Sequence, residues 1–362
     1  MLICKDVMLA DVGYDDKSCN YVRYPVENTM SRGIFDFMKN HPVYADADKR
    51  WHIELDQSTY FWYDLLVHPP EGYDTKQEIA NFLKHLKKAV ETQLDKRFIY
   101  FLASRTKLRF CTSKKPRYSL LERDLVLYVE VGASRKPIRT TTTMRDASGK
   151  RITPPVEVSD RFITFDDPTG HKISYPIHDF FDMVGIKFGI DTEIHYVGYT
   201  KNPDDRPLNR AHRGLADMLY KVSNAEYDFF IFYNLFKVLA IAGTPSSAFN
   251  FIVANSMIDE VRVDEEGRII EKVLIKYFST EIQELNKSNE VGELENTLAQ
   301  LASKNKIGSI SFDIQVGHPS EMYRFYYRAV AAADRHTFTC RIGDNGAEIV
   351  LGPATPMFGE IL

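Results

Sequence analysis

The amino-acid sequence predicts a mixed α/β (α+β) protein. Its 362 residues are 44% hydrophobic and 27% charged, a globular balance with ample apolar material for a core. Some segments alternate apolar and polar residues, which is typical of strands. Others repeat apolar residues every three or four positions, which is typical of helices. Ordinary domain sizes indicate two or three domains, and we expect three parts, residues 1–155, 156–306 and 307–362.

The N-terminal part, residues 1–155, is predicted to be a mixed α/β domain. The strand-like stretches "RWHIELD" and "STYFWYDLLVH" come first, and residues 75–97 form the clearest amphipathic helix. Two strands follow, "RFIYFLASRTKLRFCT" and "RDLVLYVEVG", with the turn "SKKPRYS" between them. The Pro pair in "ITPPVEVSD" disfavours both a helix and a central strand, so we place the first domain boundary there.

The two later parts also mix strands and helices. Tyr227 to Gly243 is the longest apolar stretch, and we interpret it as a buried core element because it is too short and too polar to span a bilayer. A helical stretch, Glu290 to Lys304, leads to a C-terminal α+β extension. In that extension we expect a strand at "SISFDIQVG" and a helix at "SEMYRFYYRAVAAADR", capped by Ser320.

Features of secreted and membrane proteins are missing from the sequence. The chain does not open with a basic segment followed by an apolar one, so secretion is not expected. The four cysteines are scattered without a CxxC pair, which fits reduced thiols and excludes a cysteine-rich zinc site. We therefore expect a cytoplasmic protein without a membrane partner.

Basic residues are concentrated in one segment. The whole chain has a formal net charge of −4, but Lys96 to Arg151 contains fifteen Lys or Arg and four Asp or Glu, hence 15 − 4 = +11. The remainder must then carry −4 − 11 = −15. A segment this basic is a candidate phosphate-binding surface, although a solvated sheet face gives the same pattern. Its candidate nucleic-acid contacts are Lys114, Lys115, Arg117, Arg135, Lys136 and Arg139.

One acidic residue lies on the apolar face of a predicted helix. In "GRIIEKVLIKYFSTEIQELN", at about 100° per residue, Ile270 and Leu274 share an arc, and Glu271 lies about 40° from its centre. A carboxylate on a buried stripe costs free energy unless a partner or a metal compensates it. Glu271 is therefore either a structural ion-pair partner or a ligand in a cleft.

Around this helix, over residues 170–290, the sequence resembles the GIY-YIG nuclease superfamily. Tyr196-Val197-Gly198 resembles the family's "YIG" strand, and Arg206 follows Tyr196 by 206 − 196 = 10 residues, as the family's arginine does. "EKVLIKYF" resembles the helix that carries the family's glutamate, which here is Glu271. Asn286 follows it by 286 − 271 = 15 residues, where the family has an asparagine.

The resemblance implies a small sheet flanked by helices and a metal-dependent hydrolysis of phosphodiester bonds. Glu271 would hold one Mg²⁺ or Mn²⁺, since a single carboxylate suits a cation that keeps most of its water ligands. The planar guanidinium of Arg206 would orient the scissile phosphate. Tyr196 would hydrogen-bond within the site, and Asn286 would support the metal-binding helix.

Three basic residues after Arg206 are further candidates. His212 could contact the phosphate or donate a proton, and a structural histidine would look the same. Arg210 and Arg213 flank it and could contact the DNA backbone, although a solvated helix face would also place them there.

The family's first tyrosine, which is thought to take the proton from the attacking water, has no literal counterpart because no "GIY" precedes "YVG". If "GIK" is the first motif, Lys187 replaces the tyrosine. If "KISYPI" is the first strand, Tyr175 is the base. We favour Tyr175, because "DFFDMVGI" has a helical pattern and the chemistry requires a phenol.

These features predict an endonuclease that acts on DNA, with a basic N-terminal domain that positions the substrate. Restriction, phage defence and mobile-element biology are the contexts that the resemblance suggests. The alternative is a catalytically silent nucleic-acid-binding or sensing protein on the same scaffold, which the missing "GIY" supports. The sequence leaves open whether the protein is a homo-oligomer.

Overall fold

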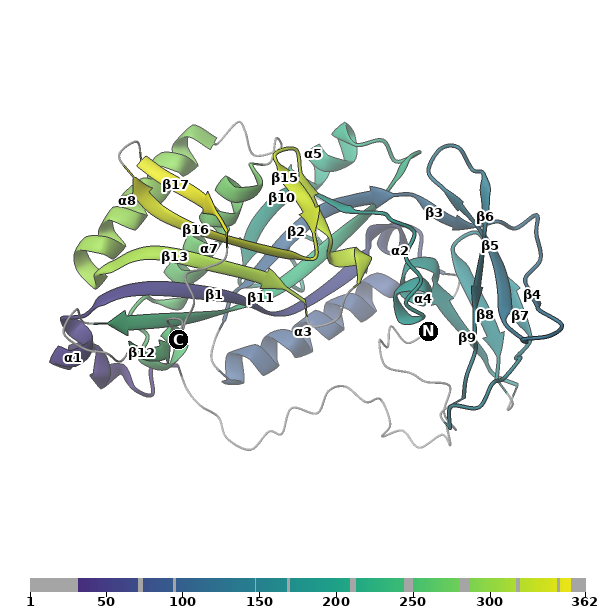
Figure 1. Ribbon diagram of the computed structural model, residues 1–362, viewed down its shortest axis with the longest axis horizontal. Helices are drawn as coiled ribbons and strands as arrows, with labels where there is room; N and C mark the ends of the chain where they lie inside the picture. Colours follow the sequence, from purple (N-terminus) through teal and green to yellow (C-terminus); the bar gives the residue numbers. More distant parts are fainter. Residues whose placement is uncertain are drawn as a thin grey trace, which may run out of the picture.

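The computed structural model confirms the mixed α and β class. It describes residues 32–70, 74–93, 96–146, 148–167, 170–208, 213–243, 250–279, 287–316, 320–343 and 346–352. Within these ranges a ten-stranded sheet has the order β15-β14-β10-β2-β11-β1-β13-β16-β17, with β12 paired to β11 (Figure 1). Its strands are β1 (Asp48–Trp62), β2 (Phe98–Thr106), β10 (Thr192–Thr200), β11 (Tyr227–Gly243), β12 (Asn250–Ala254), β13 (Ile307–Gln315), β14 (Phe325–Tyr327), β15 (Val330–Ala333), β16 (Arg335–Gly343) and β17 (Gly346–Leu351).

Helices cover both faces of the sheet. β2 and β11 are buried at almost every position, because neither face of these two strands meets solvent. On one face Leu274 and Leu298 share a core with Phe101 of β2, and on the other Leu83 and Leu215 share a core with Tyr100. The helices are η1 (Asp36–Asn40), α1 (Pro42–Ala45), α2 (Tyr63–Val67), α3 (Thr75–Gln93), α4 (Ile177–Met183), α5 (Arg213–Lys221), α6 (Asn255–Ile258), α7 (Val263–Phe278), α8 (Lys287–Asn305) and η3 (Glu321–Tyr323).

The chain between β2 and β10 forms an insertion with two small sheets. One sheet has the order β3-β5-β4, with β6 paired to β5, and the other has the order β7-β8-β9. The insertion lies at one end of the molecule, on the right in Figure 1. Its strands are β3 (Leu108–Phe110), β4 (Arg117–Tyr118), β5 (Leu125–Val131), β6 (Pro137–Thr142), β7 (Val156–Val158), β8 (Phe162–Asp166) and β9 (Lys172–Pro176).

A buried carboxylate fastens this insertion to the main sheet. Asp228 of β11 accepts hydrogen bonds from the Leu108 backbone N–H at 3.1 Å, from Arg109 at 2.8 Å and from His178 at 2.9 Å. Burial alone would raise the pKa of Asp228, but the hydrogen bonds and charges of His178 and Arg109 hold it at about 2. Each buried charge therefore has a partner, which is the condition under which a buried ion pair is tolerated.

Several predicted elements are confirmed. The predicted helix at residues 75–97 corresponds to α3, and the helical stretch Glu290 to Lys304 lies within α8. "SISFDIQVG" forms β13, and the long apolar stretch is one buried strand, β11. None of the helices within the described ranges combines the length and the apolar character needed to cross a membrane.

The predicted helix "SEMYRFYYRAVAAADR" is wrong. Only the short η3 forms there, and the strands β14 and β15 follow it. Phe325 and Tyr327 are buried with the more exposed Tyr326 between them, and β14 pairs in parallel with β10. Pairing at the sheet edge thus outweighs a sequence pattern that fits a helix. Ser320 nevertheless caps this turn, because its hydroxyl accepts a hydrogen bond from the Met322 backbone N–H at 3.1 Å.

The main sheet takes strands from all three predicted parts of the chain. β1 and β2 come from residues 1–155, β10 to β12 from residues 156–306, and β13 to β17 from residues 307–362. Pro154 and Pro155 lie between β6 and β7, inside the insertion. The Pro pair therefore separates the two small sheets of the insertion.

Candidate functional site

Pairing between β2 and β10 brings two tyrosines together. The strands are antiparallel, with Gly198 opposite Tyr100 and Tyr196 opposite Leu102, so Tyr100 and Tyr196 lie on the same face of the sheet. Their rings are stacked, with centroids 5.9 Å apart and planes inclined by 18°. Tyr100 is fully buried, whereas Tyr196 is half-buried. One tyrosine of this pair is thus enclosed by the protein, and the other is partly exposed.

Gly198 allows the Tyr100 ring to cross β10. A Cβ atom at position 198 would lie 2.2 Å from Cζ and 2.3 Å from the hydroxyl oxygen of Tyr100. Carbon atoms in contact are normally about 3.5–4.0 Å apart, so no larger residue fits beneath this ring. The absence of a side chain at Gly198 therefore lets the Tyr100 hydroxyl reach over the backbone of β10.

The helix α7 is fastened to the end of β10 by its first turns. Asp264 accepts hydrogen bonds from the Tyr199 hydroxyl and from Arg97, both at 2.8 Å, and from Lys201. Although burial alone would raise the pKa of Asp264, these hydrogen bonds hold it well below its ordinary value. Gly267 lies one turn further along, where a Cβ atom would be 2.6 Å from the Tyr199 ring. The helix backbone therefore lies directly against β10.

The attachment of α7 to β10 also fixes the position of Glu271. Residues seven apart lie on almost the same face of an α-helix, about 10 Å apart along its axis, so Glu271 shares the face of Asp264 that is turned towards β10. Glu271 is half-buried and has interactions with its surroundings. The position predicted from the apolar arc is thus consistent with a carboxylate at the boundary between core and solvent.

Arg206 lies in the turn that follows β10. The turn is held by a hydrogen bond from the Arg206 backbone N–H to the Asn202 carbonyl at 2.9 Å, and by the Tyr233 hydroxyl, which donates to the Pro203 carbonyl at 2.9 Å. Tyr233 is the β11 neighbour of Tyr100 in the sheet. The Arg206 side chain is exposed, so its guanidinium is accessible to a ligand from solvent.

Tyr100 interacts electrostatically with Tyr196, Arg206 and Glu271. Burial raises the pKa of Tyr100 far above its ordinary value, Tyr196 and Glu271 raise it further, and Arg206 opposes them. Tyr100 also shares a hydrogen bond with Tyr196. The two tyrosine rings and α7 belong to cores on opposite faces of the sheet, and Tyr100, whose hydroxyl crosses β10, interacts with residues on both sides. We call Tyr100, Tyr196, Arg206 and Glu271 the candidate site.

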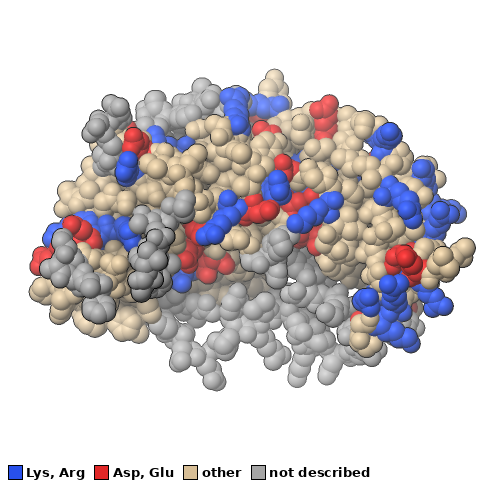
Figure 2. Space-filling model, viewed as in Figure 1, with Lys and Arg blue, Asp and Glu red and all other residues tan. Residues whose placement is uncertain are grey.

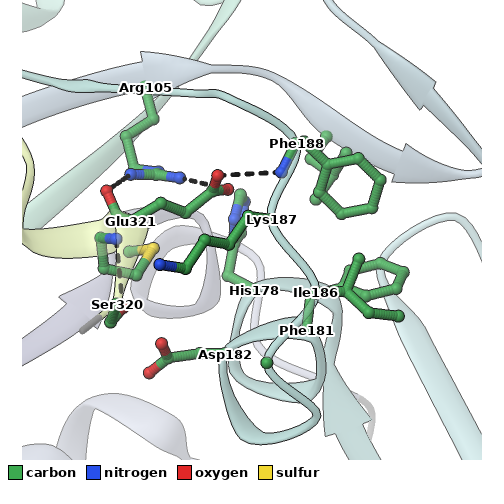
Figure 3. Close-up of a pocket in the computed structure, with 12 residues that line it drawn as sticks. Arg105, His178, Phe181, Asp182, Ile186, Lys187, Phe188, Ser320 and Glu321 are labelled. Carbon is green, nitrogen blue, oxygen red and sulfur yellow. Dashed lines mark hydrogen bonds and ion pairs between the residues drawn. The ribbon is translucent and has the colours of Figure 1, made fainter. Parts of the chain in front are cut away.

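The two residues that the sequence offered for the first motif, Tyr175 and Lys187, lie away from the candidate site. Tyr175 is in β9 of the insertion, where it is buried with its ring 6.3 Å from that of Phe165, in a different sheet from Tyr196. Lys187 lies in the segment between α4 and β10 and lines a cavity at the base of the insertion (Figure 3). His212, Asn286 and Arg210 lie outside the described residues.

Tyr100 is the member of the candidate site that the sequence analysis missed. The segment "FIY" at residues 98–100 differs from "GIY" only in its first residue, and this was the available signal. Tyr100 precedes Tyr196 by 196 − 100 = 96 residues, because the whole insertion separates the two paired strands. The segment directly upstream of "YVG" therefore does not include Tyr100.

The donor set of the candidate site fits a hard divalent cation. Within the described residues, no group of three or more His, Cys, Asp and Glu side chains is positioned to hold a metal ion. Glu271 supplies one carboxylate, and Mg²⁺ and Mn²⁺ favour oxygen ligands, with Mg²⁺ often bound through one or two carboxylates and several waters. The residues present therefore fit a hydrated Mg²⁺ or Mn²⁺ at Glu271 better than a metal enclosed by protein ligands.

Predicted nucleic-acid contacts share the outer face of the insertion. The Lys114 ammonium lies 4.6 Å from the centre of the Tyr128 ring, and Arg139 is the cross-strand partner of Tyr128. Arg117 pairs with Val126 on the same strand β5, whose side chain points to the same face as that of Tyr128. Figure 2 shows Lys and Arg side chains gathered at this end of the molecule.

The remaining predicted contacts are dispersed. Arg135 and Lys136 are exposed in the turn between β5 and β6, and Lys115 is exposed in the turn between β3 and β4. Arg213, the first residue of α5, is largely exposed and lies 3.7 Å from Asp217 of the same helix. Cations are therefore present at both ends of β5.

The cavity beside Lys187 is too small for a substrate. Its volume is about 30 Å³, which holds one or two water molecules. Glu321 fills one wall, where it pairs with the buried Arg105 at 3.0 Å and accepts hydrogen bonds from the backbone N–H groups of Phe188 and Gly189 at 2.8 and 3.0 Å (Figure 3). These contacts hold the segment before β10 in place.

No protein-family model, curated protein or solved structure matches this chain.

Proposed function

We propose that the protein is a divalent-metal-dependent endonuclease of the GIY-YIG type that hydrolyses phosphodiester bonds in DNA. The observation that carries the proposal is the grouping of Tyr100, Tyr196, Arg206 and Glu271 around β10, although β2, β10 and α7 are far apart in the chain. Three of these residues were proposed from the sequence, and the fourth, Tyr100, is a phenol that stacks on one of them.

Each residue has a role that follows from its exposure. Arg206 is exposed and offers a planar fork of donors to the scissile phosphate. Glu271 would hold Mg²⁺ or Mn²⁺, which when bound would stabilise the developing negative charge on the phosphate and favour deprotonation of the nearby water and phenols. Tyr196 is only half-buried, so we assign it the role of the base that accepts the proton of the attacking water.

Tyr100 is a positioning residue in this scheme. It is fully buried, so it does not meet the attacking water, but it stacks on Tyr196 and shares a hydrogen bond with it. Hydrolysis forms a bond between the water oxygen and phosphorus and breaks one phosphorus–oxygen bond of the backbone. Tyr100 would hold the Tyr196 hydroxyl in the direction from which that water attacks.

The test is cleavage of supercoiled and linear DNA with Mg²⁺ or Mn²⁺ by the wild type and by Glu271→Ala and Arg206→Ala. We expect each substitution to lower the cleavage rate by about 10²–10³-fold, because each removes a charge that acts on the transition state. Glu265→Ala is the matched control for Glu271→Ala, since Glu265 is an exposed carboxylate on the same helix. Arg341→Ala, on β16, is the control for Arg206→Ala. Equal cleavage by all five proteins would refute the assignment.

A silent nucleic-acid-binding protein is the alternative, and the basic outer face of the insertion favours it as much as it favours a nuclease. It predicts DNA binding that weakens with salt and survives Glu271→Ala, without cleavage in either metal. For a nuclease and for a silent binding protein alike, Lys114→Ala combined with Arg139→Ala should reduce the slope of log affinity against log salt by about two. The reason is that about one counterion is released per phosphate contact. Cleavage by the wild type excludes this alternative. Restriction, phage defence or mobile-element maintenance in the cytoplasm would be suitable settings for the nuclease.

A further inference from the structure

Two leucines at the tip of the insertion point into solvent. Leu120 and Leu121 lie in the turn between β4 and β5 and are 99% and 97% exposed, more than any other large apolar side chain that the structure describes. Burial of such side chains is the main favourable term in folding and association. Exposed turns are usually polar, but this turn has two adjacent leucines that do not pack into the core.

The turn that carries them is firmly built. The backbone N–H of Ser119 donates to the Asp124 carbonyl at 2.8 Å, and the backbone N–H of Asp124 donates to the Ser119 hydroxyl at 3.0 Å. The Thr143 hydroxyl donates to the Asp124 carboxylate at 2.6 Å, and Arg151 donates to the Glu122 carbonyl. Because neighbouring segments of the insertion brace the turn, insertion of its tip into a partner would lose little conformational entropy.

Cations surround this tip. Arg117 and Arg123 are exposed immediately before and after the leucines, and Arg151 lies against the turn with 46% of its side chain exposed. Arg145 pairs with Arg151 in a short bridge, and Lys150 is exposed beside it. The exposed Glu122 also lies beside the leucines, but cations outnumber it. An apolar point among mostly positive side chains is complementary to a polyanion with an apolar interior.

A duplex fits this surface better than a membrane does. The cations continue from the tip along the outer face to Arg139 and to Arg135 at the opposite end of β5. The seven residues of β5 span about 23 Å, the length of roughly seven base pairs. A flat anionic membrane would contact the tip alone and leave most of these cations without an anionic partner. A duplex that lies along the sheet would contact both the leucines at the tip and the cations along β5.

We propose that Leu120 and Leu121 form a wedge that enters duplex DNA between neighbouring base pairs and kinks it, while the surrounding cations contact the phosphates. The proposal rests on the DNA substrate of the proposed function and adds a second contact, outside the candidate site. Apolar side chains that enter the minor groove in this way unstack a base step and bend the duplex by about 20–90°. The bend would bring more of the DNA onto the protein, which offsets the cost of unstacking.

The test measures bending without cleavage. A duplex of about 30 base pairs with a fluorescence donor and acceptor at its ends is mixed with the protein in EDTA, and a second duplex carries 2-aminopurine to report unstacking. The wild type should raise both the energy transfer and the 2-aminopurine fluorescence. Leu120→Ser with Leu121→Ser should abolish both signals and weaken binding about tenfold, with an unchanged salt slope, because no phosphate contact is lost. The matched control is Leu351→Ser on β17, another exposed leucine, which should behave as the wild type does.

The remaining outcomes contradict the wedge, except one that contradicts only the nuclease. Unchanged bending in the double variant, or binding by the wild type without a bend, excludes it. Loss of binding to phosphatidylserine vesicles with no effect on DNA assigns the leucines to a membrane instead. A wild type that cleaves DNA without bending it refutes the wedge alone, whereas one that bends DNA but never cleaves it refutes the nuclease alone. The side chains of both leucines are exposed, so circular dichroism should show an unchanged fold in the double variant.

Discussion

Replacement of Gly198 by alanine tests how the candidate site is built. The new methyl group would lie 2.2 Å from Cζ of Tyr100, so the ring must move by more than about 1 Å to restore an ordinary carbon–carbon contact. The ring is fully buried and stacked on Tyr196, so it has little room to move. We expect a loss of about 1–3 kcal/mol in the free energy of unfolding, the usual cost of overpacking a core.

The assay is denaturant unfolding of Gly198→Ala beside Gly308→Ala. Gly308 is the matched control because it also lies in a strand of the main sheet and a Cβ atom there meets nothing within 4 Å. The control should stay within about 0.5 kcal/mol of the wild type. The free energy of unfolding depends only on the packing, so this half of the prediction holds whatever the protein does. Equal midpoints for the two variants would show that Tyr100 does not cross β10 above Gly198.

The second half concerns activity. A displaced Tyr100 hydroxyl would no longer hold that of Tyr196, and a misplacement of about 1 Å can cost about 10²-fold in rate. Tyr100→Phe separates the two effects, since it keeps the ring and removes only the hydroxyl. We expect this variant to lower the rate of DNA cleavage and to change its pH profile, with little effect on the Michaelis constant. A variant with the rate and pH profile of the wild type would refute the positioning role of Tyr100.

Two further predictions concern the surroundings of the site. Gly267→Ala should lower the free energy of unfolding by about 1–2 kcal/mol, because its Cβ atom would lie 2.6 Å from the Tyr199 ring. Gly292→Ala in α8, whose Cβ atom meets open space, should raise the free energy of unfolding by up to about 1 kcal/mol. Thermal unfolding that shifts in the same direction for both variants would contradict this prediction. The second prediction concerns Asp228, whose pKa of about 2 in the folded protein lies below the usual value of an unfolded aspartate. Its ionised form therefore stabilises the fold above about pH 4. This contribution, about 2 kcal/mol, is lost as the pH falls from about 4 to about 2. Unfolding at pH 6 and pH 3 should therefore differ more for the wild type than for Asp228→Asn, and an equal difference would show that Asp228 does not titrate with folding.

Local patterns in the sequence were sufficient for the helix that carries Glu271 and for the strand that contains Gly198. Both depend on residues within a few turns or positions of each other, so the spacing of apolar residues predicts them. The same rule failed for residues 320–335, where Phe325 and Tyr327 belong to a strand. That segment is short, and its structure depends on the edge of β10 that it meets, which no local pattern contains.

By itself the sequence determined a mixed α and β protein, several of its helices and strands, the half-buried carboxylate of Glu271 and the basic segment around Lys114. Only the tertiary structure decided that Tyr100 joins Tyr196, since strand pairing connects residues across an insertion of any length and sequence separation carries no information about it. It also decided that residues 108–142 of the basic segment form a small sheet with Leu120 and Leu121 in one of its turns. Exposure is a property of the whole fold: these leucines are apolar in the sequence, but only the packed chain shows that no part of the core covers them.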